Sequence, residues 1–142
     1  MRSLVNIVKI RDYTRDVLDI LTRAYEREIL LLPPSTQFVV GGNCQGGIIA
    51  LALARRLANA GRVPMRLILM EWNFHYGRYS GPVTILYGAD SYTARQYRGT
   101  GERNPGDPDW KLDFPDHKVI CIPGGHGEFF SEGNIDGLAS AI

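Results

Sequence analysis

The chain has 142 residues, of which 44% are hydrophobic and 22% are charged, and its formal net charge is +1. This composition is typical of one soluble globular domain, and the balanced charge gives no indication of a nucleic-acid surface. No apolar run reaches the length of about 18 residues that predicts a membrane span, and the N-terminal stretch carries too many charges for a secretory signal. The two cysteines, Cys44 and Cys121, lie far apart without metal-ligand spacing. We therefore expect a cytoplasmic protein with no disulfide, no metal and no cofactor.

Apolar periodicity divides the chain into alternating helices and strands. The first clear helix is expected to be capped by Asp12 or Thr14 and to end before Pro33, and the second is expected to end at Gly61. In chain order the pattern predicts a short strand at 4–10, a helix at 13–31, a strand at 38–42, a helix at 46–59, strands at 65–70 and 83–87, a short helix at 92–97, a polar loop at 99–109, a strand at 118–122 and a helix at 134–142.

The expected strands are continuously apolar rather than alternating, and helices join them. This pattern is typical of a parallel sheet that is covered on both faces. The sequence therefore predicts an α/β fold with three layers, α/β/α, and a mainly parallel sheet. Since functional residues in such sheets gather at the carboxyl ends of the strands, candidate residues are sought there.

A glycine-rich turn follows the strand at 38–42 and reads Gly42-Asn43-Cys44-Gln45-Gly46. It has the form of a nucleophile elbow, in which a sharp strand-to-helix turn presents one side chain between two glycines. Cys44 would stand at a helix N-terminus, where the helix dipole favours the reactive thiolate, and the Gln45 N–H would point toward an oxyanion. The alternative is that Cys44 is a small buried residue at a tight turn. Cys121, inside an apolar run, is expected to be core.

Titratable residues follow the later strands. Glu71 and Asp90 come directly after the strands at 65–70 and 83–87, and His126 follows the last strand within a glycine-rich segment. A histidine in this place is suited to general-base work, and either acid could orient its ring. The order nucleophile, acid, histidine is that of the α/β-hydrolase triad. The alternatives are a surface-loop histidine, a turn aspartate and a solvated strand-end glutamate, and spacing alone does not choose between the two acids.

Four segments resemble the thioesterase domains of polyketide and nonribosomal peptide synthetases. They are the elbow with the helix that follows it, MRLILMEWNF, GPVTILYGADS and the final VICIPGGHGEFF. These thioesterase domains belong to the α/β-hydrolase superfamily. The resemblance places the nucleophile at Cys44, the histidine at His126 and the acid at Glu71, with Asp90 near the more general acid position of the superfamily. The Cys-containing box also resembles that of polyhydroxyalkanoate synthases.

The resemblance implies an acyl thioester substrate, carried on a phosphopantetheine carrier protein, and an acyl pocket that Trp72, Phe74 and Tyr76 would line. The alternative interpretation is that these aromatic side chains cap an edge of the sheet. Two features of the family are reduced, because only about 40 residues precede the elbow and almost no lid follows Glu71. We therefore expect residues 1–142 to form a single domain of this kind or the C-terminal part of a larger one. An exposed sheet edge would favour a homo-oligomer.

The predicted function is hydrolysis of acyl thioesters through a Cys-His-acid triad and a covalent acyl-enzyme. Two alternatives remain open. One is an acyltransferase of the polyhydroxyalkanoate-synthase type, and the other is a non-catalytic α/β-hydrolase remnant that serves as an interaction domain.

Overall fold

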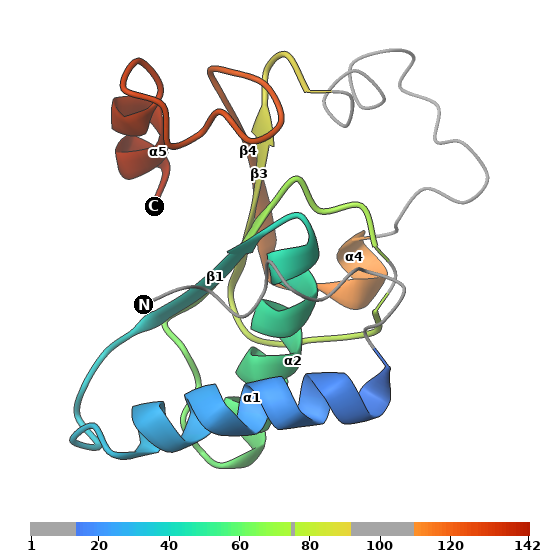
Figure 1. Cartoon of the computed structure of the whole chain (residues 1–142), viewed down its shortest axis with the longest axis vertical. Helices are drawn as coiled ribbons and strands as arrows, with labels where there is room; N and C mark the ends of the chain where they lie inside the picture. The colour runs from blue at the N-terminus through green and yellow to red at the C-terminus, as the bar shows by residue number, and fades with distance from the viewer. Residues whose placement is uncertain (1–13, 75, 92–109) are drawn as a thin grey trace.

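The computed structural model describes residues 14–74, 76–91 and 110–142 (Figure 1). The predicted strand at 4–10, the predicted helix at 92–97 and the predicted loop at 99–109 lie outside these residues. Apart from the short helix α4, which the pattern did not predict, the described elements follow the predicted order with shifts of one or two residues at their ends. They are the helices α1 (Arg15–Leu30), α2 (Gln45–Asn59), α4 (Trp110–Asp113) and α5 (Ile135–Ala141), and the strands β1 (Val39–Asn43), β2 (Arg66–Met70), β3 (Val83–Gly88) and β4 (His117–Ile122).

The four strands form one sheet in the order β1-β2-β3-β4, and every neighbouring pair is parallel. Leu69 in the middle of the sheet lies opposite Gly42 on one side and Ile85 on the other. The parallel sheet confirms the predicted fold class. Its consequence for function is that the carboxyl ends of all four strands meet at one edge.

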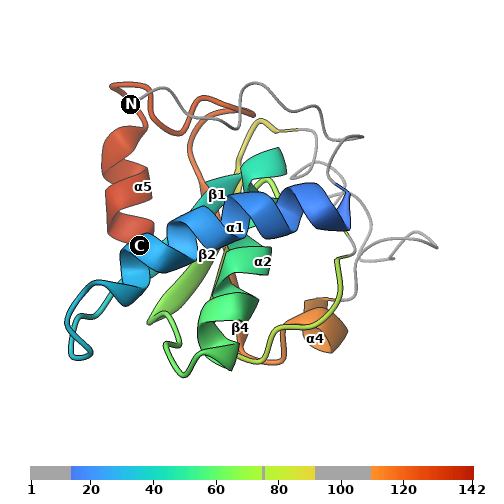
Figure 2. The same cartoon turned by 60° about the horizontal axis from the view of Figure 1, so that its bottom comes forward.

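Helices cover both faces of this sheet (Figure 2). On one face α2 packs against β1 and β2, and α1 packs on α2. The apolar cluster on this face includes Leu57, Leu67 and Ile85. A separate cluster on the other face joins Ile68 and Leu86 of the sheet to α5. The two clusters account for the continuously apolar strands, since β2 and β3 are buried from both sides.

Helix α1 begins where the sequence allows a cap, because the Thr14 side chain accepts a hydrogen bond from the Val17 N–H. Polar contacts then fix the helix against α2. The Arg56 guanidinium reaches across to the carboxylates of Asp19 and Glu26. The hydrogen bond to Glu26 raises the pKa of Arg56. These contacts orient α1, in which Leu21 and Thr22 are the buried residues.

The expectation that Cys121 is core is wrong. Cys121 is exposed on β4, and Val119 on the same strand is 48% exposed. The reason lies in the sheet order, because β4 is the outer member of the four described strands, whereas β2 and β3 lie between other strands. An apolar run alone does not tell an outer strand from a central one.

Candidate active site

Cys44 lies between the end of β1 and the start of α2. Its backbone has φ 50° and ψ −117°, a conformation that L-residues rarely adopt outside strained functional turns. The turn is held in place because the Cys44 N–H donates a hydrogen bond of 2.8 Å to the Met70 carbonyl at the end of β2. The strand, the strained residue and the helix follow one another as a nucleophile elbow requires.

Gly42 is required by the close approach of strand and helix at this turn. A Cβ atom at Gly42 would lie 2.2 Å from the Gly46 carbonyl oxygen, which is far inside contact distance. Gly46 contributes its backbone to this approach, but a Cβ of its own would meet nothing within 4 Å outside the helix. Gly47 packs against the Trp72 ring, at 3.0 Å from where its Cβ would stand.

Glu71 follows β2 directly and has φ 54°. Over residues 14–74, 76–91 and 110–142, Cys44 and Glu71 are the non-glycine residues with positive φ. Glu71 is only 2% exposed. Its Oε1 accepts a hydrogen bond of 2.8 Å from the Gly88 N–H, whereas its Oε2 is buried without a hydrogen-bond partner. A buried carboxylate oxygen without a partner is costly, and such oxygens gather at functional sites.

His126 is the group that faces this oxygen. Its Nδ1 lies 3.7 Å from Glu71 Oε2, and the histidine side chain is 55% exposed. Positive φ angles at Gly124 and Gly127 form the tight loop that carries the ring. The described residues contain no hydrogen bond between the Cys44 thiol and the His126 ring, although both residues adjoin the Met70–Glu71 segment.

Asp90, the other acid candidate, is exposed on the turn after β3. Its backbone N–H donates to the Gly124 carbonyl, and its carboxylate has no ion pair among the interactions of the described residues. The structure thus brings Glu71, and not Asp90, to His126.

Gln45 is the first residue of α2. The backbone N–H groups in the first turn of a helix have no intrahelical partner, so the Gln45 N–H is available beside the Cys44 side chain. This arrangement is compatible with the predicted role in an oxyanion hole.

The aromatic residues after Glu71 divide into two kinds. Trp72 is fully buried in the core cluster and packs edge-on against Phe74 and Phe114, with ring centroids 5.2 and 6.2 Å away. Phe74 is half-buried and Tyr76 is 37% exposed. The burial of Trp72 favours a packing role over the lining of an acyl pocket.

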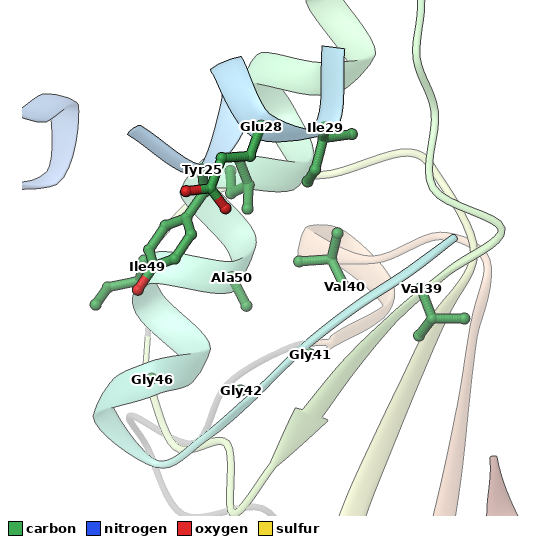
Figure 3. A pocket seen from close by; sticks show the side chains of 11 residues that line it. Tyr25, Glu28, Ile29, Val39, Val40, Gly41, Gly42, Gly46, Ile49 and Ala50 are labelled. Atoms are coloured by element: carbon green, nitrogen blue, oxygen red, sulfur yellow. The ribbon is translucent and has the colours of Figure 1, made fainter. Parts of the chain in front are cut away.

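An apolar groove lies beside the elbow on the side of β1 away from β2 (Figure 3). It has a volume of about 370 Å³. Figure 3 shows side chains approaching it from three elements: Tyr25 and Ile29 from α1, Ile49 from α2 and Val40 from β1. Gly42 and Gly46 of the elbow form its end. The groove lies at the outer side of β1, which among the described strands has a neighbour on one side only.

Within residues 14–74, 76–91 and 110–142, no three His, Cys, Asp or Glu side chains gather as metal ligands would. In the same part of the chain, no helix combines the length and the apolar character needed to cross a bilayer.

Sequence reasoning missed two residues that shape the site. Gly88 donates to Glu71, and a Cβ at Gly88 would lie 2.4 Å from the Gly124 carbonyl oxygen, so this glycine lets the histidine loop approach the acid. Glu128 accepts a hydrogen bond of 2.7 Å from the Gly125 N–H. An acid three residues after a glycine turn is a sequence signal for such a side-chain-to-backbone contact.

No protein-family profile matches this sequence, and no curated protein matches it either. Solved structures do match in fold. The thioesterase domain of NocB from the nocardicin cluster is similar at 19% identity with a TM-score of 0.66, over 87% of this chain and 72% of that one. YbtT, a type II thioesterase from the yersiniabactin pathway, matches at 13% identity with a TM-score of 0.64, again over 87% and 72%. SrfTE, the thioesterase domain that cyclises surfactin, matches at 14% identity with a TM-score of 0.65, over 89% and 72%.

These neighbours confirm the resemblance in fold to thioesterase domains. At such low identity the likeness concerns the fold alone. More than a quarter of each of these solved domains has no counterpart in this chain.

Proposed function

We propose that this chain carries the catalytic residues of an acyl thioesterase, with Cys44 as nucleophile, His126 as general base and Glu71 as the acid that orients the histidine. The observation that carries the proposal is the buried, unpartnered Oε2 of Glu71, 3.7 Å from His126 Nδ1. A buried acceptor without a donor is stabilised when the facing ring becomes a cation, which is the state that a general base reaches during acyl transfer.

The chemistry would run in two steps. His126 Nε2 takes the thiol proton while Cys44 Sγ attacks the thioester carbonyl. The tetrahedral intermediate then expels the substrate thiolate, which takes the proton from the ring. In the second step a water molecule gives a proton to His126 and attacks the new thioester, and Cys44 leaves and regains that proton. The Gln45 N–H would stabilise the oxyanion in both steps.

Two features support a thioester as the substrate. Exchange between thiols is nearly isoenergetic, so a cysteine nucleophile is well matched to a thiol leaving group. The fold neighbours include thioesterase domains, and a further match covers 15% of a four-domain nonribosomal peptide synthetase. We propose a carrier-protein-bound acyl group as the natural substrate, and the chain as one part of a larger α/β-hydrolase domain.

The strained backbone of Cys44 also supports a catalytic elbow over a remnant that keeps the turn for packing. A φ of 50° and a ψ of −117° cost about 1–3 kcal/mol at a non-glycine residue. A glycine would remove that cost, so a turn kept only for packing would have no need of a cysteine.

Hydrolysis of short acyl thioesters tests the proposal. The parent, Cys44→Ala and Cys121→Ser would be compared, with circular dichroism to show that each variant is folded. The parent and Cys121→Ser should release thiol, and Cys44→Ala should not. Equal activity in folded Cys44→Ala would reject the mechanism, and a folded parent inactive on every thioester would favour the remnant.

A further inference from the structure

His126 depends on a loop that Glu128 closes. The Glu128 carboxylate accepts a hydrogen bond of 2.7 Å from the Gly125 N–H, next to the histidine. A second hydrogen bond joins the same two residues, since the Glu128 backbone N–H donates to the Gly125 carbonyl at 3.1 Å. His126 and Gly127 are thus enclosed in a turn that Glu128 holds at both backbone groups of Gly125.

The residues after this turn hold Glu128 in its place. The Asn134 amide donates a hydrogen bond of 3.0 Å to the Glu128 carbonyl, and the Ser131 N–H donates to the same oxygen at 3.0 Å. A Cβ atom at Gly124 would lie 2.4 Å from the Asn134 side chain, so the histidine loop and Asn134 lie in direct contact. The start of α5 follows directly and anchors the segment to the sheet through Leu138.

We propose that Glu128 is a positioning residue for His126. It would act through the Gly125 N–H and not on the reacting atoms, and the inference rests on the proposed function of His126 as general base. Two glycines with positive φ flank the histidine, so the loop has little intrinsic stiffness. The Glu128 hydrogen bond supplies the stiffness that keeps the exposed ring within reach of Glu71.

A matched set of variants separates positioning from charge and from stability. Glu128→Ala removes the acceptor, whereas Glu128→Gln keeps an oxygen that can accept from Gly125 and removes only the charge. Glu132→Ala removes an exposed carboxylate from the same segment and is the control for net charge. All variants carry Cys121→Ser, because Cys121 is exposed and would itself react with a thiol reagent.

The first measurement is the rate of Cys44 alkylation by iodoacetamide as a function of pH, with His126→Ala as the reference for a lost Cys–His pair. Glu128→Ala should move the parent profile toward that of His126→Ala, and Glu128→Gln and Glu132→Ala should keep the parent profile. In thioester hydrolysis Glu128→Ala should lose about tenfold to a hundredfold in kcat. The conservative Glu128→Gln should stay within about threefold of the parent.

The inference is overturned if Glu128→Ala lowers only the melting temperature and keeps the parent alkylation profile. It is also overturned if the parent and His126→Ala alkylate alike, because no Cys–His pair then exists to be positioned. The alkylation profile needs no substrate. A parent that hydrolyses no thioester would therefore contradict the proposed function while the role of Glu128 is still decided by alkylation.

Discussion

Glu71 and His126 meet at the carboxyl edge of the sheet through the Oε2 and Nδ1 atoms, 3.7 Å apart. The two residues differ sharply in exposure, since the Glu71 side chain is 1% exposed and the His126 side chain is 55% exposed. The acid is therefore fixed within the protein, while the histidine ring is open to a ligand. A general base needs this difference, because the buried carboxylate can orient the ring through Nδ1 while the exposed side of the ring exchanges protons with a ligand.

Replacing Glu71 by Gln should separate orientation from packing. The Gln oxygen can still accept from the Gly88 N–H, so the fold should be kept, but the charge that faces His126 is lost. We expect thioester hydrolysis to fall by about a hundredfold or more, with an unchanged melting temperature. Asp90→Asn is the control and should keep parent activity. A loss in Asp90→Asn with full activity in Glu71→Gln would reverse the assignment of the acid.

The two glycines of the elbow should respond oppositely to alanine. Gly42→Ala places a methyl group 2.2 Å from the Gly46 carbonyl oxygen and should lower the free energy of unfolding by several kcal/mol, on the order of the largest single-residue effects. Gly46→Ala meets nothing outside its helix and should be neutral or stabilising by up to about 1 kcal/mol. Urea unfolding of both variants measures the difference. Similar losses in the two would show that the approach of strand to helix is not what selects Gly42.

The strain at Cys44 predicts that activity and stability are opposed at this position. Cys44→Gly and Cys44→Ala both remove the thiol, but only glycine adopts φ 50° and ψ −117° without cost. We expect Cys44→Gly to be more stable than Cys44→Ala by about 1 kcal/mol in urea unfolding, and both to be inactive. Equal stability of the two would mean that the backbone at Cys44 stores no strain.

Tyr79 gives a prediction on pH and stability away from the site. Its hydroxyl is buried without a partner, and burial raises the pKa of Tyr79 above the ordinary value of about 10. Because the folded state holds the proton more tightly, the stabilisation is fully present below pH 10 and is lost as the pH rises through the folded-state pKa.

Tyr79→Phe should therefore raise the free energy of unfolding by about 1 kcal/mol at pH 7, since it removes an unsatisfied hydroxyl. It should also weaken the fall in stability above pH 10. Urea unfolding at pH 7 and at pH values above 10 measures both effects, with Tyr76→Phe as the exposed control. A Tyr79→Phe variant less stable than the parent at pH 7 would show that the hydroxyl has a partner after all.

Much of the fold could be predicted because the apolar pattern of β2 and β3 reports burial on both faces directly. The elbow could be predicted because Gly42 and Cys44 have local reasons for their identity, namely a close backbone approach and a strained turn. The exposure of Cys121 could not, since the position of β4 at the side of the sheet depends on the order of strands and not on its own residues.

The geometry that distinguishes Glu71 from Asp90 could not be predicted from their spacing. Both acids follow strands, and only the three-dimensional arrangement buries Glu71 against His126 and leaves Asp90 exposed. The roles of Gly88 and Glu128 were missed for the same reason. Their contacts join β3 to the acid and close the histidine loop. The spacing of Glu128 three residues after Gly125 is the sequence signal for the second contact, and no such signal exists for Gly88.

The central claim is a covalent acyl group on Cys44, and peptide mass spectrometry tests it most directly. The Cys121→Ser protein would be mixed with a short acyl thioester, quenched with acid within seconds and digested. We predict an acyl mass increment on the peptide that contains Cys44, absent from His126→Ala and from protein unfolded before mixing. Thioester hydrolysis without any acyl group on Cys44, or equal labelling of the native and the unfolded protein, would contradict the account.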